Sequence, residues 1–169
     1  MKQPNIVVMG VAGCGKSSLG LALANALGAS YIEGDSYHPP QNIARMAAGI
    51  PLTDADRAGW LALLAQRLAS GVAQGEAMVL ACSALKRRYR DTLRQGDPKL
   101  LFVHLAGNKA LIAERMAARD AHFMPGSLLD SQFHDLEEPA GDERCIRCDI
   151  SQPLDRLLQQ LLQQLAQHQ

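Results

Sequence analysis

Short apolar runs alternate with segments of helical period along this chain. The runs lie at residues 6–9, 31–32, 78–82, 100–105 and 145–150. Continuous rather than alternating hydrophobicity is typical of strands that are buried on both faces of a sheet. The pattern therefore predicts an α/β fold, in which helices flank a parallel five-stranded sheet through right-handed crossovers.

Capping residues mark where the predicted helices begin and end. The helix after the first run is expected to stop at Gly28, and either Thr53 or Asp54 is expected to cap a later one. Leucines at spacings of three and four follow Pro153, which is a favourable first-turn residue. We expect this last helix to pack against the sheet, although a partner helix is the alternative.

The segment 10–17 carries the most specific chemistry. It reads Gly-Val-Ala-Gly-Cys-Gly-Lys-Ser, which fits G-x-x-x-x-G-K-S/T between a predicted strand and a predicted helix. Such a loop turns its backbone N–H groups toward phosphate oxygens, and the helix N-terminus adds partial positive charge. Lys16 is expected to reach the β- and γ-phosphates, and the Ser17 hydroxyl is expected to ligate Mg²⁺. The predicted nucleotide-binding residues of this loop are Gly10, Val11, Ala12, Gly13, Cys14, Gly15, Lys16, Ser17 and Ser18.

Two fragments imitate GTPase motifs, but neither is complete. Asp56 and Gly59 fit D-x-x-G inside a predicted helix, and Asn108-Lys109 begins N-K-x-D but ends at Leu111. A GTPase is therefore not favoured, and 169 residues are too few for a large ATPase motor. A small kinase remains as the predicted class.

The composition limits the kinds of partner that this protein is expected to bind. The 17 Lys and Arg residues balance 17 Asp and Glu residues, which argues against a general nucleic-acid binder. The apolar runs are too short for a signal peptide or a membrane span, so a cytoplasmic protein is expected. The four cysteines are expected to be free thiols, because Cys145-x-x-Cys148 lacks the second pair that a zinc site would need.

A kinase also needs an acid beside the acceptor hydroxyl and cations over the transferred phosphoryl group. Asp35 follows the second predicted strand and is expected to accept the hydroxyl proton, with Glu33 in the outer shell of the metal. Arg115 and Arg119 are expected to lead into a lid at residues 119–127 that closes over the phosphates. Ordinary surface arginines are the alternative.

Basic and polar side chains near other strand ends are candidates for binding an anionic acceptor. Lys86 and Arg90 lie four residues apart after the third strand and are predicted to clamp an anion, with a solvated basic helix face as the alternative. Asn42 and Arg45 share a predicted helix face. For His38, substrate contact and a structural role stay equally open.

Beyond the phosphate loop, the chain resembles the gluconate kinases over nearly its whole length. The resemblance rests on Gly34-Asp35-Ser-Tyr-His38-Pro39, Asn42, Arg45-Met46, residues 49–57, Trp60-Leu61, Cys82-Ser83-Ala84-Leu85-Lys86, Tyr89-Arg90-Asp91, His122-Phe123-Met124 and Ser131-Gln132-Phe133. It implies ATP-dependent phosphorylation of D-gluconate at the 6-hydroxyl, giving 6-phosphogluconate and ADP. Phosphorylation of shikimate, another sugar acid or a nucleoside monophosphate is the alternative, and a nonenzymatic ATP-dependent switch is a further one.

The resemblance also implies an architecture similar to that of shikimate and nucleoside monophosphate kinases. It predicts one P-loop kinase domain over residues 1–169, with a helical substrate-binding insertion at 36–75 and a lid at 119–127, in a cytoplasmic homodimer that binds ATP and Mg²⁺. The predicted catalytic residues are Lys16, Asp35 and Arg119, and Arg115 joins the nucleotide site. The predicted substrate-binding residues are Asp35, His38, Asn42, Arg45, Lys86, Arg90 and His122.

The sequence departs from the family pattern at the predicted lid and the third strand. Asp120-Ala121 stands where a basic residue and a glycine are expected before His122. No aspartate ends the third strand, so we expect Mg²⁺ to be held by Ser17, phosphate oxygens and water.

Overall fold

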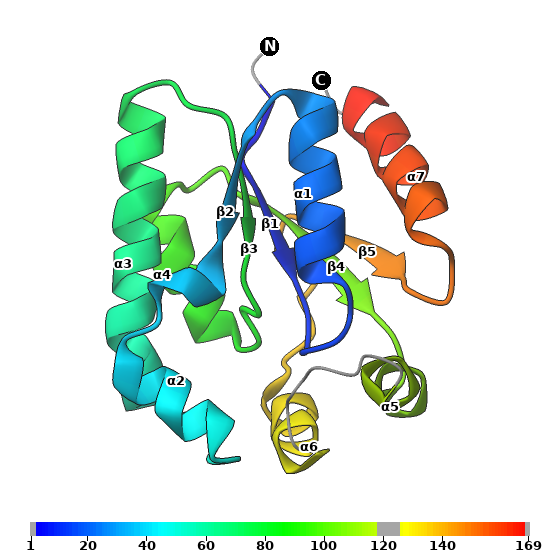
Figure 1. Ribbon diagram of the computed structural model, residues 1–169. Coiled ribbons are helices and arrows are strands. Elements are labelled where there is room, and N and C mark those ends of the chain that lie inside the picture. Colours follow the sequence, from blue (N-terminus) through cyan, green and yellow to red (C-terminus); the bar gives the residue numbers. More distant parts are fainter. Residues whose placement is uncertain (1–2, 118–125, 168–169) are drawn as a thin grey trace.

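Five parallel strands form one sheet at the centre of the computed structural model, which describes residues 3–117 and 126–167 (Figure 1). The strands are β1 (Ile6–Met9), β2 (Ser30–Glu33), β3 (Met78–Ala81), β4 (Leu101–Ala106) and β5 (Cys145–Asp149). Their order across the sheet is β2-β3-β1-β4-β5, and every neighbouring pair is parallel. The predicted five-stranded parallel sheet is confirmed.

Helices cover both faces of the sheet and one of its ends (Figure 1). They are α1 (Lys16–Leu27), η1 (Gly34–Tyr37), α2 (Pro40–Ala47), α3 (Asp54–Ala73), α4 (Arg87–Gly96), α5 (Lys109–Ala117), α6 (Gly126–Asp135) and α7 (Leu154–Gln167). The helices α1 and α7 lie on one face, and α3 and α4 lie on the other. Three helices, α2, α5 and α6, lie near the carboxyl ends of the strands, where ligands bind in open α/β sheets.

The core fills the space between the sheet and these helices. The central strands β1 and β3 are buried along their whole length, which explains why their sequences are continuously apolar. The last helix places Leu157, Leu161 and Leu165 in this core. Its apolar stripe therefore packs within the domain, as predicted.

The predicted helix caps are confirmed and account for the GTPase-like fragments. Gly28 caps α1 in the left-handed conformation, with φ 66°. Thr53 caps α3 through a capping box, in which its hydroxyl accepts from the backbone of Asp56 at 3.1 Å and the Asp56 carboxylate accepts from its backbone at 2.9 Å. Asn108 accepts a 2.8 Å hydrogen bond from the backbone N–H of Leu111 at the start of α5. Asp56 therefore lies in the first turn of α3, and Asn108 directly precedes α5, so both GTPase-like fragments are parts of helix starts.

The cysteines of this chain are not paired in disulfides. All four cysteines are free, and residues 3–117 and 126–167 contain no group of His, Cys, Asp and Glu side chains that could hold a metal ion. Within the same ranges, no helix is both long and apolar enough to span a bilayer.

Candidate active site

The phosphate-binding loop connects β1 to α1 and depends on glycine backbones. Gly10 has φ 147°, and a Cβ atom there would lie 2.9 Å from the carbonyl oxygen of Leu105. Gly15 has φ 97° and is the N-cap residue of α1. Because neither position suits a residue with a side chain, the loop can keep its tight curl only with glycine.

The N-terminus of α1 faces the hollow of this loop. No described side chain caps the helix, so its first-turn N–H groups can serve an anion. Lys16 is the first residue of α1, and its Nζ donates a 3.1 Å hydrogen bond to the carbonyl oxygen of Val11. The loop therefore combines a helix N-terminus with a lysine, which is the arrangement that holds a polyphosphate.

Ser17 is paired with an acid at the end of β2. Its hydroxyl donates a 2.7 Å hydrogen bond to Oε2 of Glu33, and the same oxygen accepts from the Tyr31 hydroxyl at 2.5 Å. Burial and the hydrogen bond to Glu33 raise the pKa of Tyr31 to about 12, so this hydroxyl stays a donor. Hydroxyl and carboxylate oxygens together form a donor set that suits Mg²⁺.

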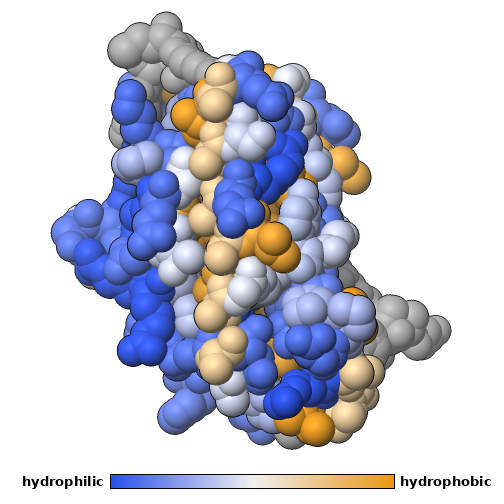
Figure 2. Space-filling model, turned by 90° about the vertical axis from the view of Figure 1, so that its left-hand side faces the viewer, coloured by the Kyte–Doolittle hydropathy of each residue, from blue (hydrophilic) through white to orange (hydrophobic). Residues whose placement is uncertain are grey.

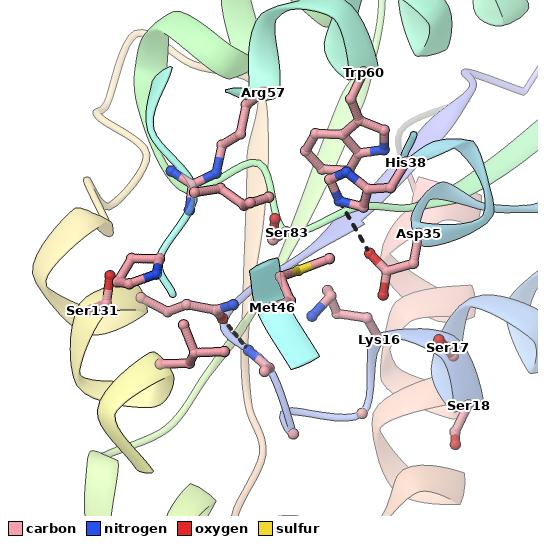
Figure 3. Close-up of a pocket in the computed structure, with 17 residues that line it drawn as sticks. Lys16, Ser17, Ser18, Asp35, His38, Met46, Arg57, Trp60, Ser83 and Ser131 are labelled. Atoms are coloured by element: carbon pink, nitrogen blue, oxygen red, sulfur yellow. Dashed lines mark hydrogen bonds and ion pairs between the residues drawn. The ribbon is translucent and has the colours of Figure 1, made fainter. Parts of the chain in front are cut away.

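A cavity of about 200 Å³ opens beside the loop (Figure 3). The side chains of Lys16, Asp35 and Arg57 line it from three different elements, α1, η1 and α3. Figure 3 shows these charged groups around one space, with Met46 and Ser83 between them. A cation of the phosphate loop, an acid and a second cation thus share one chamber.

Asp35 supplies the acidic group of this cavity, and His38 lies beside it. The Asp35 side chain is 74% exposed, and its Oδ1 lies 4.0 Å from Nε2 of His38. His38 stacks on Trp60 with ring centroids 4.0 Å apart, and burial lowers the pKa of its imidazole. Its Nδ1 lies 3.2 Å from the Asn42 amide nitrogen, which can only donate. The neutral ring therefore carries its proton on Nε2, facing Asp35.

Arg57 is a charged residue of the cavity that the sequence pattern did not mark as a site residue. It is only 7% exposed, and its Nη1 donates to the Tyr89 hydroxyl at 2.7 Å and to Asp135 at 3.2 Å. Arg57 shares the buried stripe of α3 with Trp60 and Leu64. The sequence pattern could have identified Arg57, because it lies at helical spacing with core residues and a buried guanidinium needs hydrogen-bond or charge partners.

Arg90 corrects the predicted anion clamp. Its side chain is 0% exposed and makes hydrogen bonds of 2.7 and 3.0 Å to the Glu143 carboxylate, with further bonds to the carbonyl oxygens of Ala84 and Leu85. The prediction that Arg90 faces an acceptor is therefore wrong, because α4 turns this side chain into the core, where it pairs with Glu143.

Ser83 lies between β3 and α4 and does not cap α4, which has Lys86 as its N-cap residue. Ser83 instead lines the cavity, and its carbonyl oxygen accepts a 3.2 Å hydrogen bond from the N–H of Gly10. The loop after β3 thereby supports the phosphate loop.

Three other predicted acceptor ligands lie outside the lining of the cavity. Lys86 pairs with Asp54 at 3.0 Å, and Arg45 lies 3.5 Å from the Asp56 carboxylate. Asn42 is buried and donates to the backbone carbonyl of Asp56 at 2.9 Å as well as facing His38. In this structure all three side chains contact the first turn of α3 instead of lining the cavity.

A second cavity of about 400 Å³ lies on the other side of the loop. It is bounded by Gly15 and Ser18, by Arg115, and by the segment after β5 that includes Ile150 and Pro153. Arg115 donates a hydrogen bond to the carbonyl oxygen of Ile150. The structure thus places Arg115 beside the phosphate loop. The predicted ligands Arg119 and His122 lie outside the described residues.

Comparisons with known proteins agree with this geometry. Residues 12–144 match the shikimate kinase family. The gluconokinase of Gluconobacter oxydans (strain 621H) is 46% identical over 96% of this chain and 91% of its own length. The thermosensitive gluconokinase of Escherichia coli (strain K12) is 42% identical over 96% of this chain and 88% of its own length. The crystal structure of a gluconokinase from Sinorhizobium meliloti 1021 superposes with a TM-score of 0.89 at 51% identity, over 98% of this chain and 93% of that one.

Proposed function

This chain belongs to the gluconokinase family, within the wider shikimate kinase family, and we propose that it phosphorylates D-gluconate. The reaction transfers the γ-phosphoryl group of ATP to the 6-hydroxyl and yields 6-phospho-D-gluconate and ADP. The observation that carries the proposal is the cavity in which Lys16, Asp35 and Arg57 meet. Full-length similarity to gluconokinases favours this acceptor over shikimate or a nucleoside monophosphate.

In this proposal the segment 10–18 holds the phosphates of ATP, and the second cavity receives its nucleoside. The uncapped N-terminus of α1 and Lys16 neutralise phosphate charge. Arg115 lines the second cavity together with Gly15 and Ser18, so it can contact the nucleotide there. Ser17 would hold Mg²⁺, with Glu33 in the outer shell, and the bound ion supplies charge neutralisation at the β- and γ-phosphates.

The acceptor end of the cavity fits a polyhydroxy carboxylate. Gluconate has a primary hydroxyl at one end and a carboxylate at the other. Asp35 accepts the proton of the attacking hydroxyl, and the Nε2–H of His38 donates to an acceptor oxygen. Arg57 pairs with the carboxylate, because it is the cation that lines the cavity from α3. Arg45, Asn42 and Lys86 act one layer further out.

Two moving parts complete the proposal. Residues 36–75 form the acceptor-binding insertion, and residues 119–127 form a lid. Arg119 and His122 belong to that lid, where Arg119 stabilises the transferred charge and His122 contacts the acceptor. Closure excludes water and so limits hydrolysis of ATP.

The enzyme is further proposed to be a cytoplasmic homodimer. Figure 2 shows a column of apolar side chains on the face of the molecule where α3 lies. The exposed apolar residues of α3 include Ala58, Ala62, Leu63 and Ala69. Such a face suits burial against a second copy. Sedimentation equilibrium should give a dimer for the native chain and a monomer for Leu63→Glu. A native monomer would contradict the dimer without affecting the proposed reaction.

A coupled ADP-release assay tests the function. The purified protein is given ATP, Mg²⁺ and, one at a time, gluconate, shikimate, other sugar acids and nucleoside monophosphates. The kcat/KM for gluconate should be at least 100-fold higher than for the other acceptors. That ratio corresponds to a difference of about 3 kcal/mol in transition-state binding. Preference for another acceptor would reassign the substrate. If no acceptor caused ADP release, the protein would instead be a nonenzymatic ATP-dependent switch.

A further inference from the structure

The hydroxyl of Tyr89 lies between the cavity arginine and an acid of the next layer. It accepts a 2.7 Å hydrogen bond from Nη1 of Arg57 and donates a short one to Oδ1 of Asp54. Tyr89 belongs to α4, whereas Arg57 and Asp54 belong to α3, and Tyr89 is only 3% exposed. This buried contact therefore ties the first turns of two helices at the edge of the acceptor cavity.

The direction of each hydrogen bond follows from the groups involved. A guanidinium has only donors, so the Tyr89 oxygen must accept from Arg57. The Asp54 carboxylate has only acceptors, so the Tyr89 proton must point toward it. Burial and the hydrogen bond to Asp54 raise the pKa of Tyr89, whereas the bonds from Tyr89 and Lys86 lower the pKa of Asp54. Both groups thus keep these protonation states at neutral pH.

Cations hold Asp54 in place from the solvent side. Lys86 donates to its Oδ1 at 3.0 Å, and Arg88 donates to its Oδ2 at 2.8 Å. Lys86 also lies over the Tyr89 ring, 5.8 Å from its centroid. The two basic residues therefore fix the carboxylate that in turn fixes the Tyr89 hydroxyl.

Arg57 is restrained from two elements through one nitrogen. Its Nη1 also donates to Asp135 of α6 at 3.2 Å, and its Cζ lies 5.3 Å from the centroid of the Tyr89 ring. Arginine loses much rotamer freedom when it binds an anion, and restraint before binding removes part of that cost. A guanidinium held in this way presents a fixed edge to the cavity.

We propose that Tyr89 is a positioning residue that orients Arg57 for the acceptor carboxylate and so makes the enzyme prefer acids over neutral polyols. This inference rests on the proposed function, because it takes gluconate as the acceptor. It assigns Tyr89, Asp54 and Lys86 to one chain of contacts that acts on the substrate through Arg57.

Tyr89→Phe tests the inference with little change in packing. The ring stays beneath Arg57, and only the hydroxyl is removed. A lost hydrogen bond to a charged group predicts a rise in the KM for gluconate of about tenfold, with kcat and the KM for ATP within about twofold of the native values. The inhibition constant of D-glucitol, which replaces the carboxylate by a neutral CH₂OH group, should change by less than about twofold.

A double-mutant cycle shows whether Tyr89 acts through Arg57. In the Arg57→Ala background, Tyr89→Phe should have no further effect on the KM for gluconate. The matched control is Thr92→Val, which removes a hydroxyl from the same helix, because the Thr92 hydroxyl donates to the backbone carbonyl of Arg88 at 3.1 Å and not to Arg57. That control should leave both acceptor constants unchanged.

Three results separate the possibilities. An unchanged gluconate KM in Tyr89→Phe, or an equal rise in the Arg57→Ala background, would overturn the positioning role. Should Tyr89→Phe fail to fold, Asp54→Asn must still raise the gluconate KM several-fold, and an unchanged KM there would overturn the role as well. A native enzyme that does not phosphorylate gluconate would instead refute the proposed function.

Discussion

Replacement of Arg90 by methionine should weaken the fold and leave catalysis intact. Arg90 is fully buried, and its guanidinium bonds both oxygens of the Glu143 carboxylate as well as two backbone carbonyls. Methionine fills much of the same volume but leaves those acceptors with fewer donors. The perturbation therefore separates a structural arginine from the substrate clamp that the sequence pattern favoured.

The expected loss of unfolding free energy follows from the Glu143 carboxylate, which stays buried after its partner Arg90 is removed. Removal of one partner from a buried ion pair costs about 3–5 kcal/mol. Arg94 still reaches Glu143 at 2.5 Å, so we expect the lower end, about 3 kcal/mol. For a domain of this size that loss lowers the melting temperature by about 6–12 °C.

The assay combines thermal unfolding with steady-state kinetics. The matched control is Arg87→Met on the same helix, because Arg87 pairs with Asp142 at the surface, where such a pair contributes at most about 1 kcal/mol. Arg90→Met should lose stability far beyond this control while its gluconate KM, measured below the melting transition, stays within about twofold. A native melting temperature together with a large rise in gluconate KM would refute the structural assignment and restore the clamp.

Three further predictions concern the phosphate loop, the acid and the buried carboxylate. Lys16→Met should lower kcat by roughly 100-fold or more, because it removes charge stabilisation at the transferred phosphoryl group. The melting temperature should hardly change, and near-native turnover would contradict the assignment of the phosphate loop. Asp35→Asn should lower kcat by about 100-fold, the scale of positioned base catalysis, and single-turnover rates that match the native enzyme would move the base elsewhere. Burial raises the pKa of Glu143, but the bonds from Arg90 and Arg94 outweigh burial and bring it from 4.5 to about 2. A carboxyl whose pKa is lower in the folded state stabilises the fold at pH values above its pKa in the unfolded state. Urea unfolding should therefore show that stability is lost as the pH falls from about 4.5 to 2. A Glu143→Gln variant with the same dependence of stability on pH would contradict this.

The sheet and the phosphate loop were open to prediction because each depends on local pattern. Buried parallel strands are continuously apolar, and the loop needs glycine at fixed positions whatever the rest of the chain does. The caps at Gly28 and Thr53 were predictable for the same reason, since a cap is satisfied within a few residues.

The acceptor site was harder to predict because its residues act across elements. Spacing alone gave Lys86 and Arg90 a common helix face, but it could not show that Glu143 lies opposite Arg90. Arg57 was overlooked because its partners, Tyr89 and Asp135, come from helices that are distant in sequence. Only the packing of α3 against α4 and α6 reveals which arginine faces the substrate and which one supports the core.

The identity and position of the phosphorylated group test the central claim most directly. The protein is incubated with ATP, Mg²⁺ and D-gluconate, and the products are resolved by phosphorus and proton NMR. The account predicts a single phosphate ester on the primary 6-oxygen of gluconate, formed in step with ADP. Inorganic phosphate without an ester, or an ester at another hydroxyl, would contradict it.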